Sequence, residues 1–300
     1  MIEKQKRLLF LVNPSAGSGK GETDFIKIKN HLNHHSIIAD LYVSDKAGGI
    51  RNFICNEDLK AFNGVCTIGG DGTIHEAVDG LMRSGKSDYL PLGVFPGGSG
   101  NSFCNDLSIN NNASALANVI NFKISPIDIM KITHADHINY SANIIGWGMA
   151  SEVNILAEKL RFLGSIRYSI ASLICILRLK SLEMDFIIEK EVIKGQGLLF
   201  LALNTMHTGK GMMMAPNAKL NDGLIDIILF RKASKLRVFK IFTQVFSGSH
   251  INDSLVEYYQ VSKFEIKTNN ERLNIDGENI GTTPINISVL PKSLNIFASL

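Results

Sequence analysis

Residues 64–82 combine a predicted strand, a glycine turn and a predicted helix, and they constrain the fold more than any other stretch. Gly64–Ile68 is typical of a short buried strand, and Gly69-Gly70-Asp71-Gly72-Thr73 of a tight turn. Apolar residues then recur at helical spacing up to Met82. Such a turn gathers backbone N–H groups at the positive end of a helix dipole, which favours a bound phosphate. Asp71 indicates that Mg²⁺ or a hydroxyl proton is handled beside that phosphate. The alternative is an ordinary turn with a solvated aspartate, and the sequence of Ile68–Thr73 alone does not exclude it.

A second glycine-rich loop, Asn13–Gly21, follows a predicted strand over Arg7–Val12 and precedes a predicted helix over residues 22–33. It departs from the Walker A motif, because Pro14 replaces the first glycine and Gly21 replaces the Ser or Thr. Its glycine spacing also differs from the G-x-G-x-x-G pattern. The loop still joins a strand to a helix, so it is consistent with a nucleotide contact.

A third turn, Gly97–Asn101, follows a predicted strand over Pro91–Pro96. It is not the G-x-S-x-G elbow of hydrolases, because Asn101 stands where that motif requires glycine. Strands and helices alternate up to this turn, which predicts a parallel α/β sheet. Ligands of such sheets bind at the carboxyl ends of the strands, so we expect the three turns to converge.

From about residue 124 the sequence predicts many strands and few helices, which indicates a β-rich domain, expected to be a sandwich. The predicted strands are Ile124–Thr133, His137–Gly146, Leu182–Glu189, Gly197–Asn204, Gly223–Arg231, Val261–Lys267 and Ile285–Leu290. Helices are predicted over about Ala150–Leu179 and about Ser234–Phe246. We therefore expect an α/β domain over residues 1–124 and a β-rich domain over 125–292. A strand within 293–300 is expected to return to the first domain.

Composition excludes several classes of protein. The formal net charge of +3 is too small to predict a nucleic-acid partner. The four cysteines form no C-x-x-C pair, so we expect reduced thiols in a cytoplasmic protein and no zinc. The most apolar predicted helix, Tyr168–Leu179, is shorter than the roughly 20 residues that a membrane span needs. The sequence therefore predicts a soluble protein that can sit on a membrane surface.

Taken together, the motifs resemble the diacylglycerol kinase catalytic-domain superfamily, which includes bacterial lipid kinases, sphingosine kinases and ceramide kinase. The resemblance covers essentially the whole chain and rests on Gly69–Thr73 with His75-Glu76, the Asn13-Pro14-x-x-Gly17 loop, Gly98–Asn101, Asp128, Trp147-Gly148, Arg161–Arg167, Asn221–Leu224 and Asp276-Gly277-Glu278. It implies an NAD kinase/diacylglycerol kinase-like α/β domain and a β-rich lipid-substrate domain. It also implies a lipid kinase that uses ATP and Mg²⁺.

The resemblance implies a role for each matching residue. Those that would line the ATP site are Asn13, Ser44, Gly69, Gly70, Asp71, Gly72, Thr73, Ser99 and Arg167. Either Asp71 or Glu278 would be the catalytic base. Asp222, with the backbone carbonyls of Lys219 and Leu224, would bind a structural metal ion. Glu152 and Asn154 would face the polar end of the substrate. One departure is that Gly49-Ile50 replaces the His-Ala common in the family.

Four of the matching positions also have an interpretation in which they serve the fold rather than the reaction. Arg167 fits a solvated helix position, and Asp222 fits a turn before glycine. Asp276-Gly277 fits a hairpin turn, and Glu152 a solvent-facing helix start.

The substrate stays open between diacylglycerol and a sphingoid base. Rival interpretations are an NAD kinase-like enzyme and a non-catalytic lipid-binding protein. A peripheral membrane contact is expected through residues 161–180 or 234–242, which mix basic and apolar side chains. Whether the chain forms a homodimer is left open.

Overall fold

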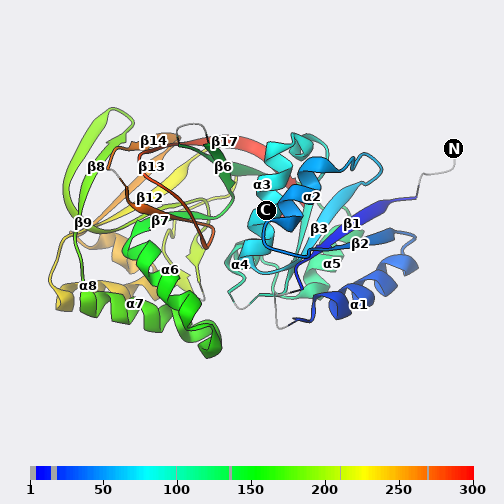
Figure 1. Ribbon diagram of the computed structural model, residues 1–300, viewed down its shortest axis with the longest axis horizontal. Coiled ribbons are helices and arrows are strands. Elements are labelled where there is room, and N and C mark those ends of the chain that lie inside the picture. Colours follow the sequence, from blue (N-terminus) through cyan, green and yellow to red (C-terminus); the bar gives the residue numbers. More distant parts are fainter. Residues whose placement is uncertain (1–4, 15–18, 99, 135–136, 210, 269) are drawn as a thin grey trace. The chain divides into compact units, whose positions relative to one another are not determined.

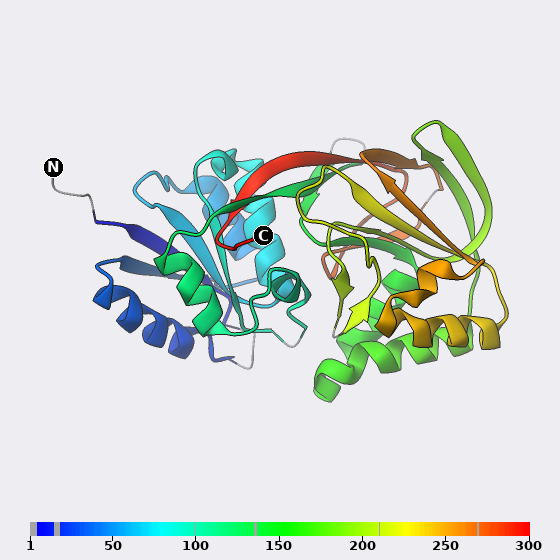
Figure 2. The same cartoon turned by 180° about the vertical axis from the view of Figure 1, so that it is seen from behind.

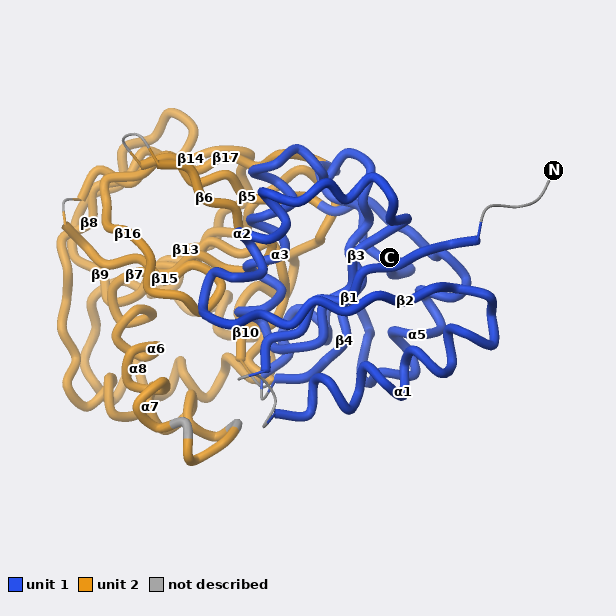
Figure 3. The backbone as a smooth tube through the Cα atoms, turned by 45° about the vertical axis from the view of Figure 1, so that its right-hand side comes forward, with its two compact units in different colours: residues 1–127, 292–300 blue, residues 128–291 orange. Residues whose placement is uncertain are grey.

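The computed structural model describes residues 5–14, 19–98, 100–134, 137–209, 211–268 and 270–300. The chain forms two compact units (Figure 3). Unit 1 comprises Met1–Ile127 with Lys292–Leu300, and unit 2 comprises Asp128–Pro291. Ser99 and residues 15–18 of the first glycine loop, for which a nucleotide contact is predicted, lie outside the described residues. No helix in the described part of the chain has the length and apolar character needed to cross a bilayer.

Unit 1 is an α/β fold with a parallel sheet, as predicted. Its strands are β1 (Arg7–Val12), β2 (Ile38–Val43), β3 (Gly64–Gly69) and β4 (Leu92–Pro96), in the spatial order β4-β3-β1-β2. Every residue of β3 is buried, as expected for a parallel strand covered by helices on both faces. At the other edge of β4, Ile296 pairs in parallel with Leu92.

Helices cover both faces of this sheet. They are α1 (Gly21–His34), α2 (Gly49–Asn56), α3 (Asp71–Arg83), α4 (Ser102–Asp106) and α5 (Asn112–Ile120), with a short 3₁₀ turn, η2, at Lys86–Asp88. In Figure 1, α1 and α5 lie on one side of the sheet and α2 and α3 on the other. In α1, Phe25, Ile28 and Leu32 recur at helical spacing and are buried, so the apolar pattern specifies the buried face of the helix.

Unit 2 is built from antiparallel strands, of which the first and the last extend into unit 1. They are β5 (Ser125–His134), β6 (His137–Ser141), β7 (Ile144–Gly148), β8 (Leu182–Ile188), β9 (Glu191–Leu203), β10 (His207–Thr208), β11 (Met212–Met213), β12 (Ile225–Arg231), β13 (Val256–Val261), β14 (Lys263–Ile266), β15 (Arg272–Ile275), β16 (Glu278–Thr282) and β17 (Ile285–Ile296). Its helices are α6 (Met149–Lys159), α7 (Arg167–Arg178) and α8 (Lys235–Gln244), and its 3₁₀ turns are η3 (Arg161–Ile166), η4 (Val245–Ser247) and η5 (Ser249–Asn252).

Two apolar cores lie on opposite faces of β9 and β12. Phe200 and Ala202 of β9 belong to a core with Trp147, whereas Leu201 and Leu203 belong to another. Successive side chains of a strand point to opposite faces, so one strand contributes to both cores. The second core is closed by residues of α7 and α8. The predicted β-rich domain is thus confirmed.

Two predicted elements are wrong in detail. The helix expected over Ala150–Leu179 is split into α6, η3 and α7. Gly164 lies within η3 at φ 61° and ψ −136°, a conformation open to glycine but not to a helix interior. The strand expected over His137–Gly146 is split into β6 and β7, because β6 pairs with β5 whereas β7 pairs with β9 and β15.

Candidate functional site

Two of the glycine turns touch each other at the carboxyl edge of the unit 1 sheet. The Gly97 N–H donates to the carbonyl of Gly69 at 2.8 Å. A Cβ on Gly98 would lie 2.5 Å from the Cα of Gly70, a distance that real Cβ contacts essentially never show. Gly98 therefore requires glycine, a Cβ on Gly70 would also be tight at 3.2 Å from the Gly98 Cα, and the turns after β3 and β4 meet backbone to backbone. The predicted convergence holds for these two turns.

Asp71 is the first residue of α3, and its carboxylate contacts the start of α4. It accepts hydrogen bonds from the N–H of Ser102 at 3.3 Å, the hydroxyl of Ser102 at 3.2 Å and the N–H of Phe103 at 3.4 Å. Such N–H donors at a helix start are those that a carboxylate satisfies well. Burial, together with the charge of Asp71, raises the pKa of Cys104 to about 12. Asp71 therefore lies at the start of α3, which follows β3, and contacts the start of α4, which follows β4.

The loop after β2 is held by side chains of its own unit. The buried Ser44 hydroxyl donates to the carbonyl of Lys46 at 2.7 Å. A Cβ on Gly49 would lie 2.4 Å from the Ser44 Oγ, so a larger residue there would displace this hydroxyl. Glu76 of α3 accepts from the N–H groups of Gly48 at 2.8 Å and Ile50 at 3.0 Å, so it holds the start of α2. Sequence reasoning did not identify this role of Glu76.

Residues 276–277 form the turn between β15 and β16, so the hairpin interpretation is confirmed. Asp276 has φ 49° and Gly277 φ 95°, as in a two-residue hairpin turn of type I′. The buried Asp276 carboxylate accepts from the Ser141 hydroxyl at 2.6 Å and from the N–H groups of Asn143 at 3.2 Å and Ile144 at 2.9 Å. The turn is thereby fixed to the start of β7. Glu278, the first residue of β16, is exposed.

The two predicted substrate residues of α6 differ in their surroundings. Asn154 is buried, and its side-chain amide donates to the carbonyl of Gly277 at 2.6 Å. It therefore contacts the turn that leads into Glu278. Glu152 is exposed and lies 3.8 Å from the ammonium of Lys180. The geometry agrees with the solvent-facing interpretation of Glu152.

The loop before β12 carries the residues predicted to bind a structural metal ion, Lys219, Asp222 and Leu224. Asp222 is exposed, and one of its oxygens accepts from the N–H of Leu224 at 3.0 Å. The fully buried Asp128 anchors the loop, because its carboxylate accepts from the Gly223 N–H at 2.6 Å and its own N–H donates to Leu220. Among the described residues no three His, Cys, Asp or Glu side chains form a metal cluster. A carboxylate with neighbouring backbone carbonyls is nevertheless a ligand set that suits Mg²⁺ or Ca²⁺.

Arg167 begins α7, and its side chain is largely buried rather than solvated as the structural interpretation held. Its guanidinium lies 3.4 Å from the Glu158 carboxylate and 3.3 Å from the Tyr168 hydroxyl. Its buried Nε has no hydrogen-bond partner among the described residues. Arg167 therefore keeps hydrogen-bonding capacity for an anion.

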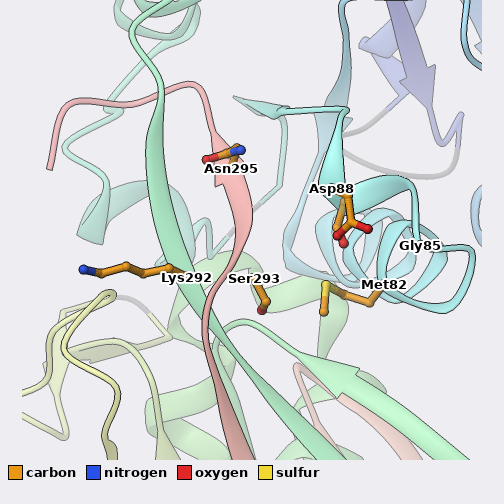
Figure 4. A pocket seen from close by; sticks show the side chains of 7 residues that line it. Met82, Gly85, Asp88, Lys292, Ser293 and Asn295 are labelled. Atoms are coloured by element: carbon orange, nitrogen blue, oxygen red, sulfur yellow. The ribbon is translucent and has the colours of Figure 1, made fainter.

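A pocket of unit 1 lies away from the glycine turns (Figure 4). It has a volume of about 400 Å³ and is lined by Met82, Gly85, Ser87, Asp88, Lys292, Ser293 and Asn295. Met82 and Gly85 stand at the end of α3 opposite Asp71, about 20 Å along a helix of this length. The pocket is therefore separate from the candidate phosphate site.

Comparisons with known proteins agree with the motifs. Residues 7–132 match the diacylglycerol kinase catalytic domain, and residues 143–298 match the YegS C-terminal NAD kinase beta sandwich-like domain. The chain is 28% identical over 285 residues to a diacylglycerol kinase of Bacillus subtilis (strain 168), covering 93% of this chain and 92% of that protein. It is 30% identical over 258 residues to a Shewanella frigidimarina (strain NCIMB 400) protein named "Probable lipid kinase YegS-like", covering 85% and 82%.

Solved structures share the fold. A diacylglycerol kinase from Bacillus anthracis str. Sterne has a TM-score of 0.74 at 19% identity, with 99% of this chain and 98% of that chain covered. An NAD kinase from Archaeoglobus fulgidus in complex with ATP is more distant, at a TM-score of 0.53 and 13% identity, with 97% and 93% covered. The chain therefore belongs to the lipid kinase-like family in which a diacylglycerol kinase catalytic domain is followed by a YegS-type β-sandwich domain.

Proposed function

We propose that the protein is a lipid kinase that transfers the terminal phosphoryl group of Mg-ATP to the hydroxyl of a diacylglycerol or a sphingoid base. One observation carries the proposal: the turns after β3 and β4 meet at Gly70 and Gly98 with no room for a side chain. The N–H groups of Gly97 and Gly98 already donate within the turns, so what this surface offers to an anion is the start of α3. Relatives named diacylglycerol kinase over nearly the whole chain support the lipid acceptor.

In this proposal unit 1 binds the nucleotide through its phosphates. The residues assigned to it are Asn13, Ser44, Gly69, Gly70, Asp71, Gly72, Thr73 and Ser99. In unit 2, Arg167 would hold a phosphate oxygen through guanidinium hydrogen bonds. Phosphoryl transfer depends mainly on positioned phosphates and charge stabilisation, so these contacts would supply most of the rate enhancement.

The catalytic base is assigned to Glu278 rather than to Asp71. Asp71 already accepts three donors from α4, whereas no described hydrogen bond occupies the exposed Glu278 carboxylate. A base must have a lone pair free for the proton of the substrate hydroxyl. Asp71 would instead orient groups beside the phosphates. Asn154 would act as a positioning residue, because it binds the turn that leads into Glu278.

Magnesium is assigned to two places. Asp222 with the carbonyls of Lys219 and Leu224 would hold an ion that stabilises the loop before β12. A second ion, bound with ATP near Asp71, would spread the charge of the transferred phosphoryl group.

Transfer of labelled phosphate from ATP to diacylglycerol, sphingosine, ceramide and NAD tests the proposal. We expect one of the lipids to be labelled in the presence of Mg²⁺ and NAD to stay unlabelled. Labelling of NAD alone would favour an NAD kinase-like enzyme, and lipid binding without transfer would favour a non-catalytic protein.

Glu152→Gln tests whether Glu152 binds an amino headgroup. If it does, the ratio of the sphingosine rate to the diacylglycerol rate should fall in this variant.

A further inference from the structure

Strand β12 carries a carboxylate within an otherwise apolar run. Asp226 is its second residue and is fully buried, although its neighbours Ile225 and Ile227 belong to the core that contains Trp147. It directly follows the loop to which the proposed structural metal ion is assigned. A buried carboxylate is costly unless hydrogen bonds or an opposite charge compensate it, so the partners of Asp226 indicate its role.

The Asp226 carboxylate receives hydrogen bonds on one oxygen only. The Tyr258 hydroxyl donates to Oδ1, and the Gln260 side-chain amide donates to the same atom at 3.0 Å. Strands β12 and β13, coloured yellow and orange, lie side by side (Figures 1 and 2). Asp226 pairs with Gln260 and Ile228 with Tyr258, which places the three polar side chains on one face of this ladder. The buried Oδ2 has no hydrogen-bond partner among the described residues.

Tyr258 links Asp226 to the loop before β12. Burial and the Asp226 carboxylate raise the pKa of Tyr258, whereas a hydrogen bond from the backbone N–H of Asn217 lowers it. The phenol oxygen therefore accepts from Asn217 while its hydroxyl donates to Asp226. Asn217 lies two residues before Lys219, whose carbonyl is assigned to the ion. The loop is thus fixed at this end by Tyr258 and at the other end by Asp128.

The carboxylates of Asp222 and Asp226 act on each other across this loop. Burial raises the pKa of Asp226 to about 6 against its two hydrogen bonds, and the charge of Asp222 contributes to this rise. No described ion pair involves either carboxylate. Like charges without a cation nearby are unfavourable, and a divalent ion beside Asp222 would relieve their repulsion.

We propose that Asp226 and Tyr258 are positioning residues for the divalent cation assigned to Asp222. Asp226 supplies a second negative charge near the ion, and Tyr258 fixes the segment that carries the Lys219 carbonyl. Outer partners of this kind orient the ligands of a metal site and change its affinity by about 10–100-fold. Both roles rest on the cation of the proposed function, but they involve neither nucleotide nor phosphoryl transfer. In a purely structural role, Asp226 would only satisfy the hydrogen bonds of its neighbours.

Thermal unfolding in MgCl₂, without nucleotide or lipid, tests these roles. The full chain is measured at about pH 8, where the Asp226 carboxyl is ionised. It is measured in EDTA and then in MgCl₂ from about 0.1 mM to about 10 mM at constant ionic strength. An ion that binds only the folded chain raises the unfolding midpoint with its concentration, which gives an apparent Kd. Asp222→Asn gives the response that remains without the assigned ligand.

The adjoining strand offers a matched control for each variant. Asp226→Asn is compared with Glu257→Gln, because Glu257 also accepts from a tyrosine hydroxyl, that of Tyr259 at 2.7 Å. Tyr258→Phe is compared with Tyr259→Phe, since each loses a hydroxyl that is bonded to a carboxylate. Glu257 also accepts from Arg231 at 3.1 Å, so its substitution should lower stability without changing the loop.

We expect Asp226→Asn and Tyr258→Phe each to raise the apparent Kd for Mg²⁺ by about tenfold or more. The midpoint of Asp226→Asn in EDTA should stay equal or rise, because the repulsion from Asp222 is removed. Both control variants should keep the parent Kd. A midpoint that responds to Mg²⁺ in the parent but not in Asp222→Asn would support the cation site on which these roles depend.

A parent-like Mg²⁺ response in Asp226→Asn or Tyr258→Phe would overturn the proposal, whether or not the variant is less stable. Equal losses of affinity in the two control variants would overturn it as well, since they would report general destabilisation. A parent that responds to Mg²⁺ no more than Asp222→Asn would refute the cation site and the proposal with it. Failure of lipid phosphorylation with the expected Mg²⁺ responses would refute only the proposed function.

Discussion

Asp71 combines a structural contact with an assigned role beside the phosphates, and the two can be separated by substitution. Asp71→Asn keeps the size of the side chain and one acceptor oxygen for Ser102. We expect phosphoryl transfer to fall by about 10²-fold, because the loss of the negative charge releases the groups that Asp71 orients, while the midpoint of thermal unfolding shifts little. Ser102→Ala is the matched control: it removes one donor and keeps the carboxylate, so most activity should remain. Near-normal activity in a folded Asp71→Asn protein would refute the assignment.

Asn154 offers a test of how the Glu278 turn is positioned. Asn154→Ala removes the donor to the half-buried Gly277 carbonyl, and the loss of this hydrogen bond costs about 0.5–1.5 kcal/mol of stability. We expect kcat to fall by about tenfold with an unchanged KM for ATP, since the assigned base would lose its position. Asn154→Asp has the same shape but no N–H donor when ionised, so it should lower kcat as Asn154→Ala does. A loss of stability with an unchanged kcat would make Asn154 a purely structural residue.

At the scale of elements, sequence patterns predicted the turns, strands and helices whose formation depends on residues close together in the chain. The strand–turn–helix around Gly70 was predicted, because its apolar spacing and its glycines lie within one short stretch. The Asp276-Gly277 hairpin was recognised from its turn residues. In contrast, the contact of Asn154 with Gly277 joins residues 123 apart. The contact of Asp71 with Ser102 joins residues 31 positions apart in the sequence. No spacing rule reports such contacts, which arise only when the elements pack.

The junction of the two glycine turns can be tested as an element. Gly98→Ala places a Cβ where the Gly70 backbone lies, so the turns must separate. We expect nucleotide affinity to fall at least about tenfold and stability to fall by about 1–3 kcal/mol, as in overpacked sites. Gly85→Asn is the control, because a side chain there would meet nothing within 4 Å and asparagine tolerates its φ of +67°. Equal effects of the two substitutions, measured by nucleotide titration and chemical denaturation, would contradict the expectation.

At the scale of the whole molecule, both units depend on the end of the chain. β17 has Ile285 and Ile287 in the core of unit 2, whereas Ile296 pairs with β4 of unit 1. Phe297 is also buried against Gly64, where a Cβ would lie 2.7 Å from its ring. The sequence predicted a parallel sheet and the return of a strand within residues 293–300, but not the pairing of that strand with β4, because contacts between residues some 200 positions apart leave no local pattern.

The stability of the whole chain should depend on pH through His250. This residue is fully buried, and its Nε2 lies 3.0 Å from the carbonyl oxygen of Met214. Burial lowers the pKa of His250, and the hydrogen bond to Met214 only partly offsets this. A lowered pKa means that the folded state favours the neutral ring, whereas the unfolded chain takes up a proton near pH 6.5. The contribution is therefore fully present above pH 6.5 and declines as the pH falls toward the lowered value.

Urea denaturation across this pH range measures the effect. We expect the free energy of unfolding to fall below pH 6.5 with a share from His250 of at most about 1.4 kcal/mol per pH unit. His250→Gln should be less stable throughout, because it disturbs the stacking on Phe230, but it should lose this share of the slope. His31→Gln, on the exposed side of α1, should keep the parent slope. If the His250 variant shows the same pH dependence as the parent, protonation of the unfolded chain at this residue does not control the acid stability of the fold.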